Sequence, residues 1–408
     1  YIPSHVELIL PKGSGTRKDP YLISNERDLF GLSVMMNYKY LICNKDTLRF
    51  RQTADIAWSG KYDWFVDSLK LAYYDGGDHV ISGMKIDRPD QDTVGFFRTL
   101  YYAYISHLTL KDFEVKGRNF VGMLAGDDGR TQIHNMRFYG KVQGDSVVGG
   151  MFGKGGDKVT NTLSFVDVSG KNMVGGMYGI CYPNLYYSAS LGKVKGDSLV
   201  GGICGMIASN HYTLFKSVYA VNDVEARTHG GIVAYNVDDS EPPSTLYKLY
   251  YKKSKYDDYP WGVALDDSIM KSEAFLDSLR FFVKGTAADS MEYPVPHRFK
   301  GQGTSASPYL LENAEDLYFF DSLYMDTITV KSLVNNHYKF AHYKMTSDVN
   351  MNKNRNHKWI PITEFYGSLD GDYHVINNMN VMDTATIEPG LRFFGQGDVA
   401  LFATFEDD

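Results

Sequence analysis

The 408-residue sequence contains few cysteines, and this scarcity limits the kinds of architecture that it can form. Three cysteines (Cys43, Cys181 and Cys204) are too few for a disulfide-based scaffold, and their spacing matches no metal-binding motif. We therefore expect all three to be small, buried apolar side chains. Low cysteine content fits an exported protein and a cytosolic one equally well, so it leaves the compartment open.

Three further absences narrow the function. Lysine and arginine are scattered without a basic stripe, and the net charge is -7, so we do not expect a nucleic-acid partner. No apolar run approaches the roughly 20 residues that cross a bilayer, so we expect no membrane span in this segment. The chain begins Tyr1-Ile2-Pro3 without a signal peptide, from which we expect a piece of a longer polypeptide whose export signal was removed or lies elsewhere.

Glycine and aromatic residues are abundant instead. The sequence holds 39 Gly, 31 Tyr and 23 Phe, without the triplet pattern of collagen. Glycine at this level indicates many turns on a β framework, and tyrosine suits strands whose outer face meets water. A hydrophobic content of 43% indicates an ordered chain.

One glycine-rich motif recurs at a fixed interval. Its four clear copies are Val121–Gly126, Val148–Gly153, Val174–Gly179 and Val200–Gly205, whose starts lie 27, 26 and 26 residues apart. A second series runs in phase with it, at Val115, Val142, Val168 and Val194. A unit this small cannot bury its own apolar face, so identical positions should stack as parallel ladders about 4.8 Å apart. The repeat predicts an all-β fold, a parallel β-helix (β-solenoid) with coils of about 26–27 residues.

The glycines of this motif have a structural and a functional interpretation. We favour backbone geometry, either a positive φ at a corner or a position where a side chain would not fit beneath the next coil. The alternative is a phosphate-binding loop, which needs a strand-loop-helix context that the motif lacks. The repeat glycines are Gly122, Gly126, Gly149, Gly150, Gly153, Gly175, Gly176, Gly179, Gly201, Gly202 and Gly205.

A longer self-similarity frames the coils. The segment Gly13–Leu29 returns as Gly301–Leu317, and each copy leads into a predicted short helix that Asn25 or Asn313 would cap. The later matches are Thr53–Ile56 with Thr346–Val349, Trp64 with Trp359, and Asp75–Ile81 with Asp370–Ile376. The sequence therefore predicts two tandem modules of one type.

The first module is expected to close with a cap. Ile269, Phe275, Leu276 and Leu279 fall at helical spacing, and an open solenoid end would expose unpaired strand edges. We predict an N-terminal lead-in over residues 1–12, a first module with its C-terminal cap over 13–296, and the truncated start of a second module over 297–408.

These elements together resemble the GLUG-motif family of bacterial extracellular repeat proteins. The likeness rests on the Gly-x-Gly-Thr segment ending Pro20-Tyr21-Leu22-Ile23, the Asp-Gly-x-x-His element at Asp75–Ile81, the coil motifs, and Tyr293-Pro294-Val295. The resemblance implies a right-handed parallel β-helix with short capping helices, secreted or held at the cell surface as part of an adhesin-like protein. Met, Ile or Val stand here where the family motif has Leu, which blurs the coil borders.

Candidate catalytic and metal-binding residues are few. A glycoside hydrolase would need two nearby carboxylates, and a lyase a basic side chain, but the recurrent acids Asp145 and Asp197 lie in Gly-Asp-Ser turns. An Asp and a His that could bind a metal occur together twice, as Asp75 with His79 and as Asp370 with His374. We favour a structural role for them, the Asp in a turn and the His at the start of a strand. We therefore expect no enzyme activity in this segment, no cofactor and no metal.

Binding remains as the expected activity. Tyrosine pairs at 101–102, 186–187 and 250–251 could form exposed rows that stack on sugar rings, against the alternative of ordinary packing. We predict an adhesin-like or structural scaffold that contacts a surface polysaccharide or a protein, with self-association into a larger surface structure also open. The alternative is a carbohydrate-active β-helix enzyme, a polysaccharide lyase or glycoside hydrolase.

Overall fold

The structure, a computed structural model, divides into two compact units, Tyr1–Met270 and Lys271–Asp408. It describes residues 10–38, 47–182, 184–208, 214–227, 229–237, 246–254, 257–259, 261–279, 281–285, 292–325, 338, 340–351, 359, 362, 365–381, 391–393 and 403–405. The predicted module border near residue 297 was drawn from sequence similarity, whereas the compact units separate between Met270 and Lys271. The sequence modules stay a prediction.

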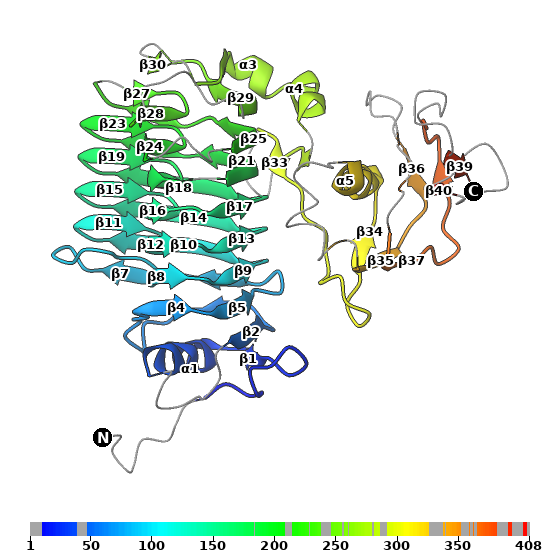
Figure 1. The fold of residues 1–408 in the computed structure, drawn as a ribbon, viewed down its shortest axis with the longest axis horizontal. Helices are drawn as coiled ribbons and strands as arrows, with labels where there is room; N and C mark the ends of the chain where they lie inside the picture. Colours follow the sequence, from blue (N-terminus) through cyan, green and yellow to red (C-terminus); the bar gives the residue numbers. More distant parts are fainter. Residues whose placement is uncertain are drawn as a thin grey trace. The chain divides into compact units, whose positions relative to one another are not determined.

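The first unit is a parallel β-solenoid, which confirms the predicted fold class. Each coil runs from sheet C through sheet B to sheet A, and successive coils stack along the chain (Figure 1). Sheet C contains β11 (Asn119–Gly122), β15 (Ser146–Gly149), β19 (Asn172–Gly175), β23 (Ser198–Gly201), β27 (His229–Gly230) and β30 (Asp257–Tyr259). Sheet B contains β4 (Ser68–Lys70), β8 (Phe97–Tyr101), β12 (Ala125–Gly129), β16 (Phe152–Gly155), β20 (Tyr178–Cys181), β24 (Cys204–Ile207) and β28 (Val233–Asn236).

Sheet A is the longest of the three, with 18 strands among the described residues. Its first strands are β1 (Tyr21–Ile23), β2 (Leu48–Gln52), β3 (Ile56–Ala57), β5 (Ala72–Asp75), β6 (Val80–Ser82), β7 (Lys85–Asp87), β9 (Tyr104–Ser106), β10 (Thr109–Lys116) and β13 (Gln132–His134). The others are β14 (Arg137–Gln143), β17 (Lys158–Thr160), β18 (Leu163–Ser169), β21 (Asn184–Leu191), β22 (Lys193–Lys195), β25 (Leu214–Ala220), β26 (Asp223–Glu225), β29 (Leu246–Lys252) and β31 (Val263–Leu265).

The repeated valines stack in the register that the sequence predicts. In sheet C, Val121 pairs with Val148, Val148 with Val174, and Val174 with Val200, and all four are fully buried. In sheet A, the second series pairs in the same way, Val115 with Val142, Val142 with Val168, and Val168 with Val194. Each coil therefore buries its apolar side chains against equivalent ones above and below.

The last glycine of each motif lies against a left-handed corner of the preceding coil. Phe120 and Val147 occupy such corners, with φ of 56° and 60°. A Cβ at Gly153 would lie 2.5 Å from the carbonyl carbon of Phe120, and one at Gly179 would lie 2.5 Å from that of Val147. None of the repeat glycines itself has a positive φ. Lack of room therefore explains them, and the alternative of glycine at positive-φ corners is wrong.

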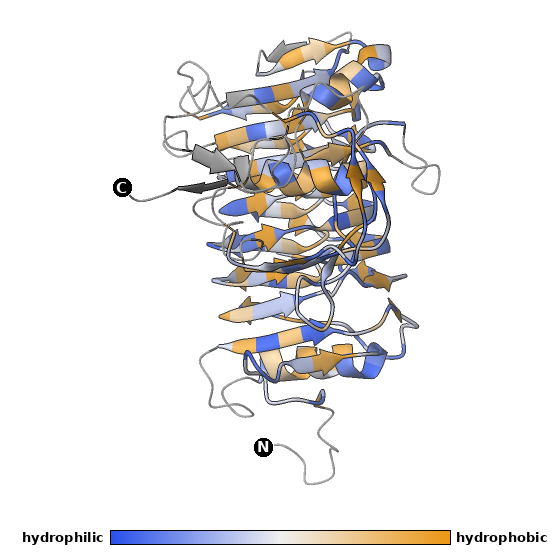
Figure 2. Ribbon diagram, turned by 90° about the vertical axis from the view of Figure 1, so that its right-hand side faces the viewer, coloured by the Kyte–Doolittle hydropathy of each residue, from blue (hydrophilic) through white to orange (hydrophobic). Residues whose placement is uncertain are grey.

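The core lies between the three sheets, and a helix covers its N-terminal end. Apolar and polar residues alternate along the strands of the stack (Figure 2). Helix α1 (Glu26–Asn37) packs against the first coil through the buried Leu29 and Leu32 (Figure 1). The Asn25 side chain accepts a hydrogen bond from the backbone nitrogen of Asp28 at 3.0 Å, which confirms the predicted N-cap.

Short helices also occur where the sequence predicts a cap. Helix α3 (Asp267–Met270) ends the first unit, and α4 (Glu273–Ser278) begins the second, with Ser272 as its N-cap. Within the residues that the structure describes, no helix is long and apolar enough to cross a membrane.

The second unit repeats the opening of the first on a smaller scale. Its helix α5 (Ala314–Met325) begins after Asn313, whose side chain accepts a hydrogen bond from the Asp316 nitrogen at 3.2 Å, as predicted. Three strands pair in parallel, β34 (Tyr309–Leu311), β35 (His342–Met345) and β37 (Ser368–Asp370), as do β36 (Val349–Asn350) and β38 (Ile376–Asn377). The antiparallel pairs are β32 (Phe282–Val283) with β33 (Val295–Pro296), and β39 (Leu391–Phe393) with β40 (Ala403–Phe405).

Two of the cysteines correct a prediction. Cys181 and Cys204 are fully buried as expected, but they form a disulfide, so the expectation of unlinked apolar side chains is wrong for this pair. Cys181 lies in β20 and Cys204 in the neighbouring strand β24, and although the register does not pair them directly, their Cα atoms are 6.5 Å apart, a distance that a disulfide spans. Cys43 lies outside the described residues.

Candidate ligand-binding groove

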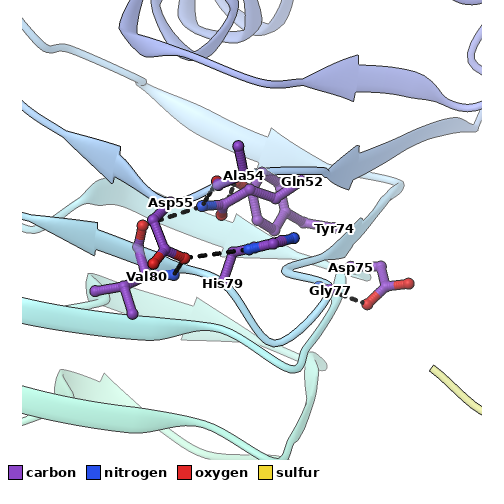
Figure 3. A network of polar contacts seen from close by, with 8 residues as sticks. All are labelled: Gln52, Ala54, Asp55, Tyr74, Asp75, Gly77, His79 and Val80. Atoms are coloured by element: carbon purple, nitrogen blue, oxygen red, sulfur yellow. Dashed lines mark hydrogen bonds and ion pairs between the residues drawn. The ribbon is translucent and has the colours of Figure 1, made fainter. Parts of the chain in front are cut away.

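Asp75 and His79 bind different partners rather than sharing one site (Figure 3). His79 Nδ1 lies 3.1 Å from Asp55 Oδ1, and the same oxygen accepts a hydrogen bond from the Val80 nitrogen at 3.0 Å. Asp75 Oδ1 accepts a hydrogen bond from the Gly77 nitrogen at 3.1 Å. The first contact joins neighbouring coils and the second closes a turn, so both residues are accounted for structurally.

Asp75 is also held by two basic side chains. His107 Nδ1 lies 3.3 Å from its Oδ1, and Arg51 Nε lies 3.4 Å from its Oδ2. Burial works to raise the pKa of Asp75, but the hydrogen bond and charge of His107, with help from Gly77 and Arg51, outweigh it and hold the pKa well below its usual range. In the described part of the chain, no three His, Cys, Asp or Glu side chains gather as metal ligands.

The second unit repeats these contacts. His374 Nδ1 lies 3.2 Å from Asp348 Oδ1, which accepts a hydrogen bond from the Val375 nitrogen at 3.0 Å. Asp370 Oδ1 accepts one from the Asp372 nitrogen at 3.0 Å. Recurrence of the same geometry in both units supports a structural role for the Asp and His pairs.

The three tyrosine pairs differ in exposure. Tyr101 and Tyr102 are 43% and 42% exposed, whereas Tyr186 and Tyr187 are only 6% and 3% exposed. In the pair at 250–251, Tyr251 is buried at 6%. Tyr186, Tyr187 and Tyr251 therefore follow the alternative of ordinary packing, and Tyr101–Tyr102 is the pair that exposes both rings.

Tyr101 borders an open depression of about 610 Å³ on the outer side of sheet B, and Tyr182 borders it from another coil. The strand register places four residues in one column across neighbouring coils. Tyr101 pairs with Gly129. Extending the pairing of Asp127 with Lys154 by two residues places Gly156 next to Gly129, and extending that of Gly155 with Cys181 by one places Tyr182 next to Gly156. The backbones of Tyr101 and Tyr182 are therefore three coils, roughly 14 Å, apart, and the Tyr101 ring leans over the first glycine of the floor, Gly129. We call this the tyrosine groove, lined by Ser68, Lys70, Thr99, Leu100, Tyr101, Asp127, Asp128, Gly129, Lys154 and Tyr182.

Cations flank each ring of the tyrosine groove. Lys70 Nζ lies 5.4 Å from the centre of the Tyr101 ring, and Lys154 Nζ lies 5.9 Å from that of Tyr182. The rings of Tyr101 and Tyr102 meet edge to face at 4.6 Å, and Arg130 Nη1 donates a hydrogen bond to the Tyr102 hydroxyl at 2.6 Å. These contacts restrict ring movement, so the aromatic surface is already in place before a ligand arrives.

A buried carboxyl lies beneath the groove floor. Asp128 Oδ2 accepts a hydrogen bond from the Gly156 nitrogen at 3.1 Å, while Oδ1 is buried near the Thr131 hydroxyl. Burial raises the pKa of Asp128 to about 6, opposed by the nearby Thr131 hydroxyl and the Gly156 N–H group. The Tyr178 hydroxyl, also buried, has no hydrogen-bond partner among the described residues, and burial together with the charge of Asp128 raises its pKa.

The glycines of the floor are required by the packing below them. Gly155 and Gly156 have φ of 143° and 103°, a range that side chains disfavour. A Cβ at Gly155 would lie 2.5 Å from Asp128 Cβ, and one at Gly156 would lie 2.7 Å from Tyr178 Cε1. Gly155 and Gly156 therefore add no side chain of their own to the space between the two tyrosines.

Sequence reasoning missed Tyr182, Lys154 and Asp128, although a signal was present. After the motif, the coils of sheet B continue as Gly126-Asp127-Asp128-Gly129 and Gly153-Lys154-Gly155-Gly156, which do not repeat each other. Departure from the repeat at one edge of two neighbouring coils is the feature that marks the groove.

One comparison with known proteins, that with solved structures, supports the fold. A crystal structure of a putative immunoglobulin A1 protease from Bacteroides ovatus is similar, with a TM-score of 0.51 over 71% of this chain and 95% of that chain, at 19% sequence identity. Halomucin of Haloquadratum walsbyi is 30% identical over 35% of this chain, and the matched part is 2% of halomucin's own length. No protein-family model matches the chain.

These findings support a repetitive β-solenoid protein. At 19% identity the structural likeness concerns the fold alone. The resemblance to the GLUG-motif family stays a prediction, because it rests on the motifs quoted from the sequence.

Proposed function

We propose that this chain is an extracellular, adhesin-like scaffold that binds a polysaccharide along the tyrosine groove. The observation that carries the proposal is the pair of exposed rings, Tyr101 and Tyr182, on either side of a glycine floor. Flat aromatic faces stack on the apolar faces of sugar rings, and an open groove admits a chain that continues past both ends.

The polar lining suits hydroxyl-bearing ligands. Ser68, Thr99, Asp127 and Lys154 line the groove alongside the rings and supply both donors and acceptors of hydrogen bonds. A stable protein partner would contact about 20 to 30 residues, more than line this groove. We therefore favour a polysaccharide over a protein as the ligand.

An extracellular location is supported by the disulfide between Cys181 and Cys204. Disulfides persist in oxidising compartments such as the cell exterior and the periplasm, and are rare in the reducing cytosol. The disulfide adds a physical argument to the location implied by the resemblance to the GLUG-motif family.

The alternative, a carbohydrate-active enzyme, draws support from Asp128. A carboxyl with a pKa of about 6 has the protonation behaviour of a general acid. Its neighbour Asp127, however, is adjacent on strand β12, and successive strand residues point to opposite faces. Both residues border the groove, but the Asp128 carboxyl is turned inward with Oδ1 buried, so the two carboxyl groups are not paired across one sugar, and we propose binding without catalysis. The protease activity in the name of the Bacteroides structure is not part of the proposal.

The test is a binding screen on a panel of neutral and acidic polysaccharides, followed by variants. Tyr101→Ala and Tyr182→Ala should each weaken binding about tenfold, because each removes one stacking surface. Tyr235→Ala is the matched control, since Tyr235 is similarly exposed, at 39%, on sheet B outside the groove. Equal affinity of all three variants would overturn the proposal, and release of shortened or unsaturated sugars would establish the enzyme instead.

A further inference from the structure

A second depression, of about 580 Å³, lies near the N-terminal coils and shares no residue with the tyrosine groove. One wall is the loop that carries Trp58, Ser59, Tyr62 and Asp63, and the other is strand β7, which ends at Asp87, together with the next residue, Arg88. We call it the tryptophan pocket.

The aromatic wall of this pocket is built in layers. Trp58 meets the buried Trp64 edge to face at 5.6 Å and lies 6.4 Å from Tyr62. Tyr62 stacks on Phe30 of helix α1 at 4.6 Å, and Trp64 stacks on Phe96 at 4.5 Å. Trp64 is buried, whereas Trp58 and Tyr62 are half-buried and line the pocket, and Trp58 is the larger of the two surfaces.

The loop is fixed in place before any ligand binds. Ser59 donates hydrogen bonds to Glu26 from its backbone nitrogen at 2.9 Å and from its hydroxyl at 2.6 Å. Arg88 Nη2 donates to Asp63 Oδ1 and to the Trp64 carbonyl, each at 3.1 Å. A preorganised wall costs little entropy on binding, which favours recognition of a small ligand.

The coil architecture does not require a tryptophan at position 58. Continuing the match of Thr53–Ile56 with Thr346–Val349 places Met351 of the second unit at the position of Trp58. Met351 is buried at 2%, so an apolar side chain of ordinary size satisfies the packing there. The ring of Trp58 and its partial exposure are therefore additions to the repeat.

Charge narrows the class of ligand. The pocket is lined by two acidic residues, Asp63 and Asp87, and two basic residues, Lys85 and Arg88, so their charges sum to zero. Lys61 Nζ already lies 5.3 Å from the centre of the Tyr62 ring, which disfavours a cationic ligand at that ring. Exposed carboxylates beside an aromatic face suit a neutral ligand with several hydroxyl groups.

We propose that the tryptophan pocket is a second glycan site, which holds one neutral pyranose unit against Trp58 with its hydroxyl groups bonded to Asp87 and Asp63. The proposal does not depend on the tyrosine groove. If both sites bind, the chain holds a glycan at two separate places on one solenoid, and the linked sites raise the overall affinity.

The test uses the intrinsic fluorescence of the intact chain. Of its four tryptophans, Trp64, Trp261 and Trp359 are 4%, 2% and 1% exposed, so quenching by acrylamide reports mainly on Trp58. Glucose, galactose, mannose, N-acetylglucosamine and their short oligomers serve as probes. At least one should protect Trp58 from acrylamide in a saturable way; protection by none of them in the unaltered protein would overturn the proposal.

Variants then separate this site from the groove. Trp58→Met installs the residue of the second unit, so the fold should be kept, while affinity for the protecting sugar, followed by calorimetry, should fall at least tenfold. Asp87→Asn should weaken it about fivefold, and Tyr101→Ala should leave it unchanged. If Trp58→Met binds the sugar as well as the unaltered chain, the pocket is not the site; if only Tyr101→Ala loses affinity, the sugar occupies the groove instead.

Discussion

The opening segment occurs in both units, and the two copies share hydrogen bonds while differing at their surfaces. The contact of Asp55 with His79 measures 3.1 Å, and that of Asp348 with His374 measures 3.2 Å. In both copies the aspartate also accepts a backbone hydrogen bond at 3.0 Å from the residue after the histidine. Polar residues that recur in the two copies therefore build the coil.

The differences between the copies lie in side chains that the coil does not need. Trp58 borders an open pocket, whereas Met351 at the matching position is buried. The tyrosine groove likewise lies where neighbouring coils stop repeating each other. We infer that repeated residues carry the architecture and that departures from the repeat mark the binding surfaces.

The largest expected effect comes from filling a repeated glycine. Gly153→Ala places a Cβ 2.5 Å from the carbonyl carbon of Phe120 and 2.6 Å from the Val121 nitrogen, and these are backbone atoms that cannot turn away. We expect the free energy of unfolding of the first unit to fall by more than about 3 kcal/mol, as measured by urea denaturation.

Gly371→Ala is the control for this prediction. Among the residues that the structure describes, no atom lies within 4 Å of a Cβ at Gly371, which is not part of the coil motif. Its effect on the unfolding of the second unit should stay within about 0.5 kcal/mol. Similar effects of the two substitutions would show that lack of room for a Cβ is not what requires the glycines of the coil motif.

A smaller effect should follow from Asp128, which does not recur in other coils. Its pKa of about 6 lies above the ordinary 3.8, so the folded state binds the proton more tightly than the unfolded state. Stability from this group is then complete below about pH 4 and is lost as the pH rises through about 6. Asp128→Asn should stabilise the first unit by about 2 kcal/mol at pH 8 and by little at pH 4.

Thermal unfolding measured between pH 4 and pH 8 checks this expectation. The unaltered chain should lose more stability than Asp128→Asn across that range. Parallel profiles for the two proteins would show that Asp128 is ionised without penalty, and would remove the carboxyl as a candidate general acid.

The smallest effect concerns the contacts that the two copies share. Asp55→Ala and Asp348→Ala each remove an exposed contact to a histidine and a backbone hydrogen bond. Each should lower the unfolding midpoint of its own unit by about 2 to 4 °C. Differential scanning calorimetry should give equal shifts; a large shift in one unit alone would mean that the two copies are not equivalent.

The sequence predicted the features that depend on the repeat. The valine ladders, the N-caps Asn25 and Asn313, and the crowding around the glycines follow from spacing and local chemistry. These properties are set within one coil or between identical positions, so a periodic pattern contains them.

Features that join unlike positions could not be predicted. Cys181 follows its coil motif while Cys204 lies within the next one, and no repeat relates the two. Tyr101 is exposed and Tyr186 is buried because their rings face different sides of a coil. The sequence does not distinguish them, since each is the first residue of a Tyr-Tyr pair. The tryptophan pocket likewise joins a loop to strand β7, two segments whose contact depends on coil stacking.

The Cys181–Cys204 disulfide has a mechanical consequence. A coil of about 26 residues stores roughly 85 Å of extended chain in about 4.8 Å of height. Under a pulling force, coils separate from an end of the stack one after another, because each is bonded only to its neighbours. The disulfide links two consecutive coils covalently, so the 23-residue separation between the cysteines stays closed under load. The solenoid can therefore lengthen in steps under load as its coils unfold, while the two coils joined by the disulfide remain covalently connected.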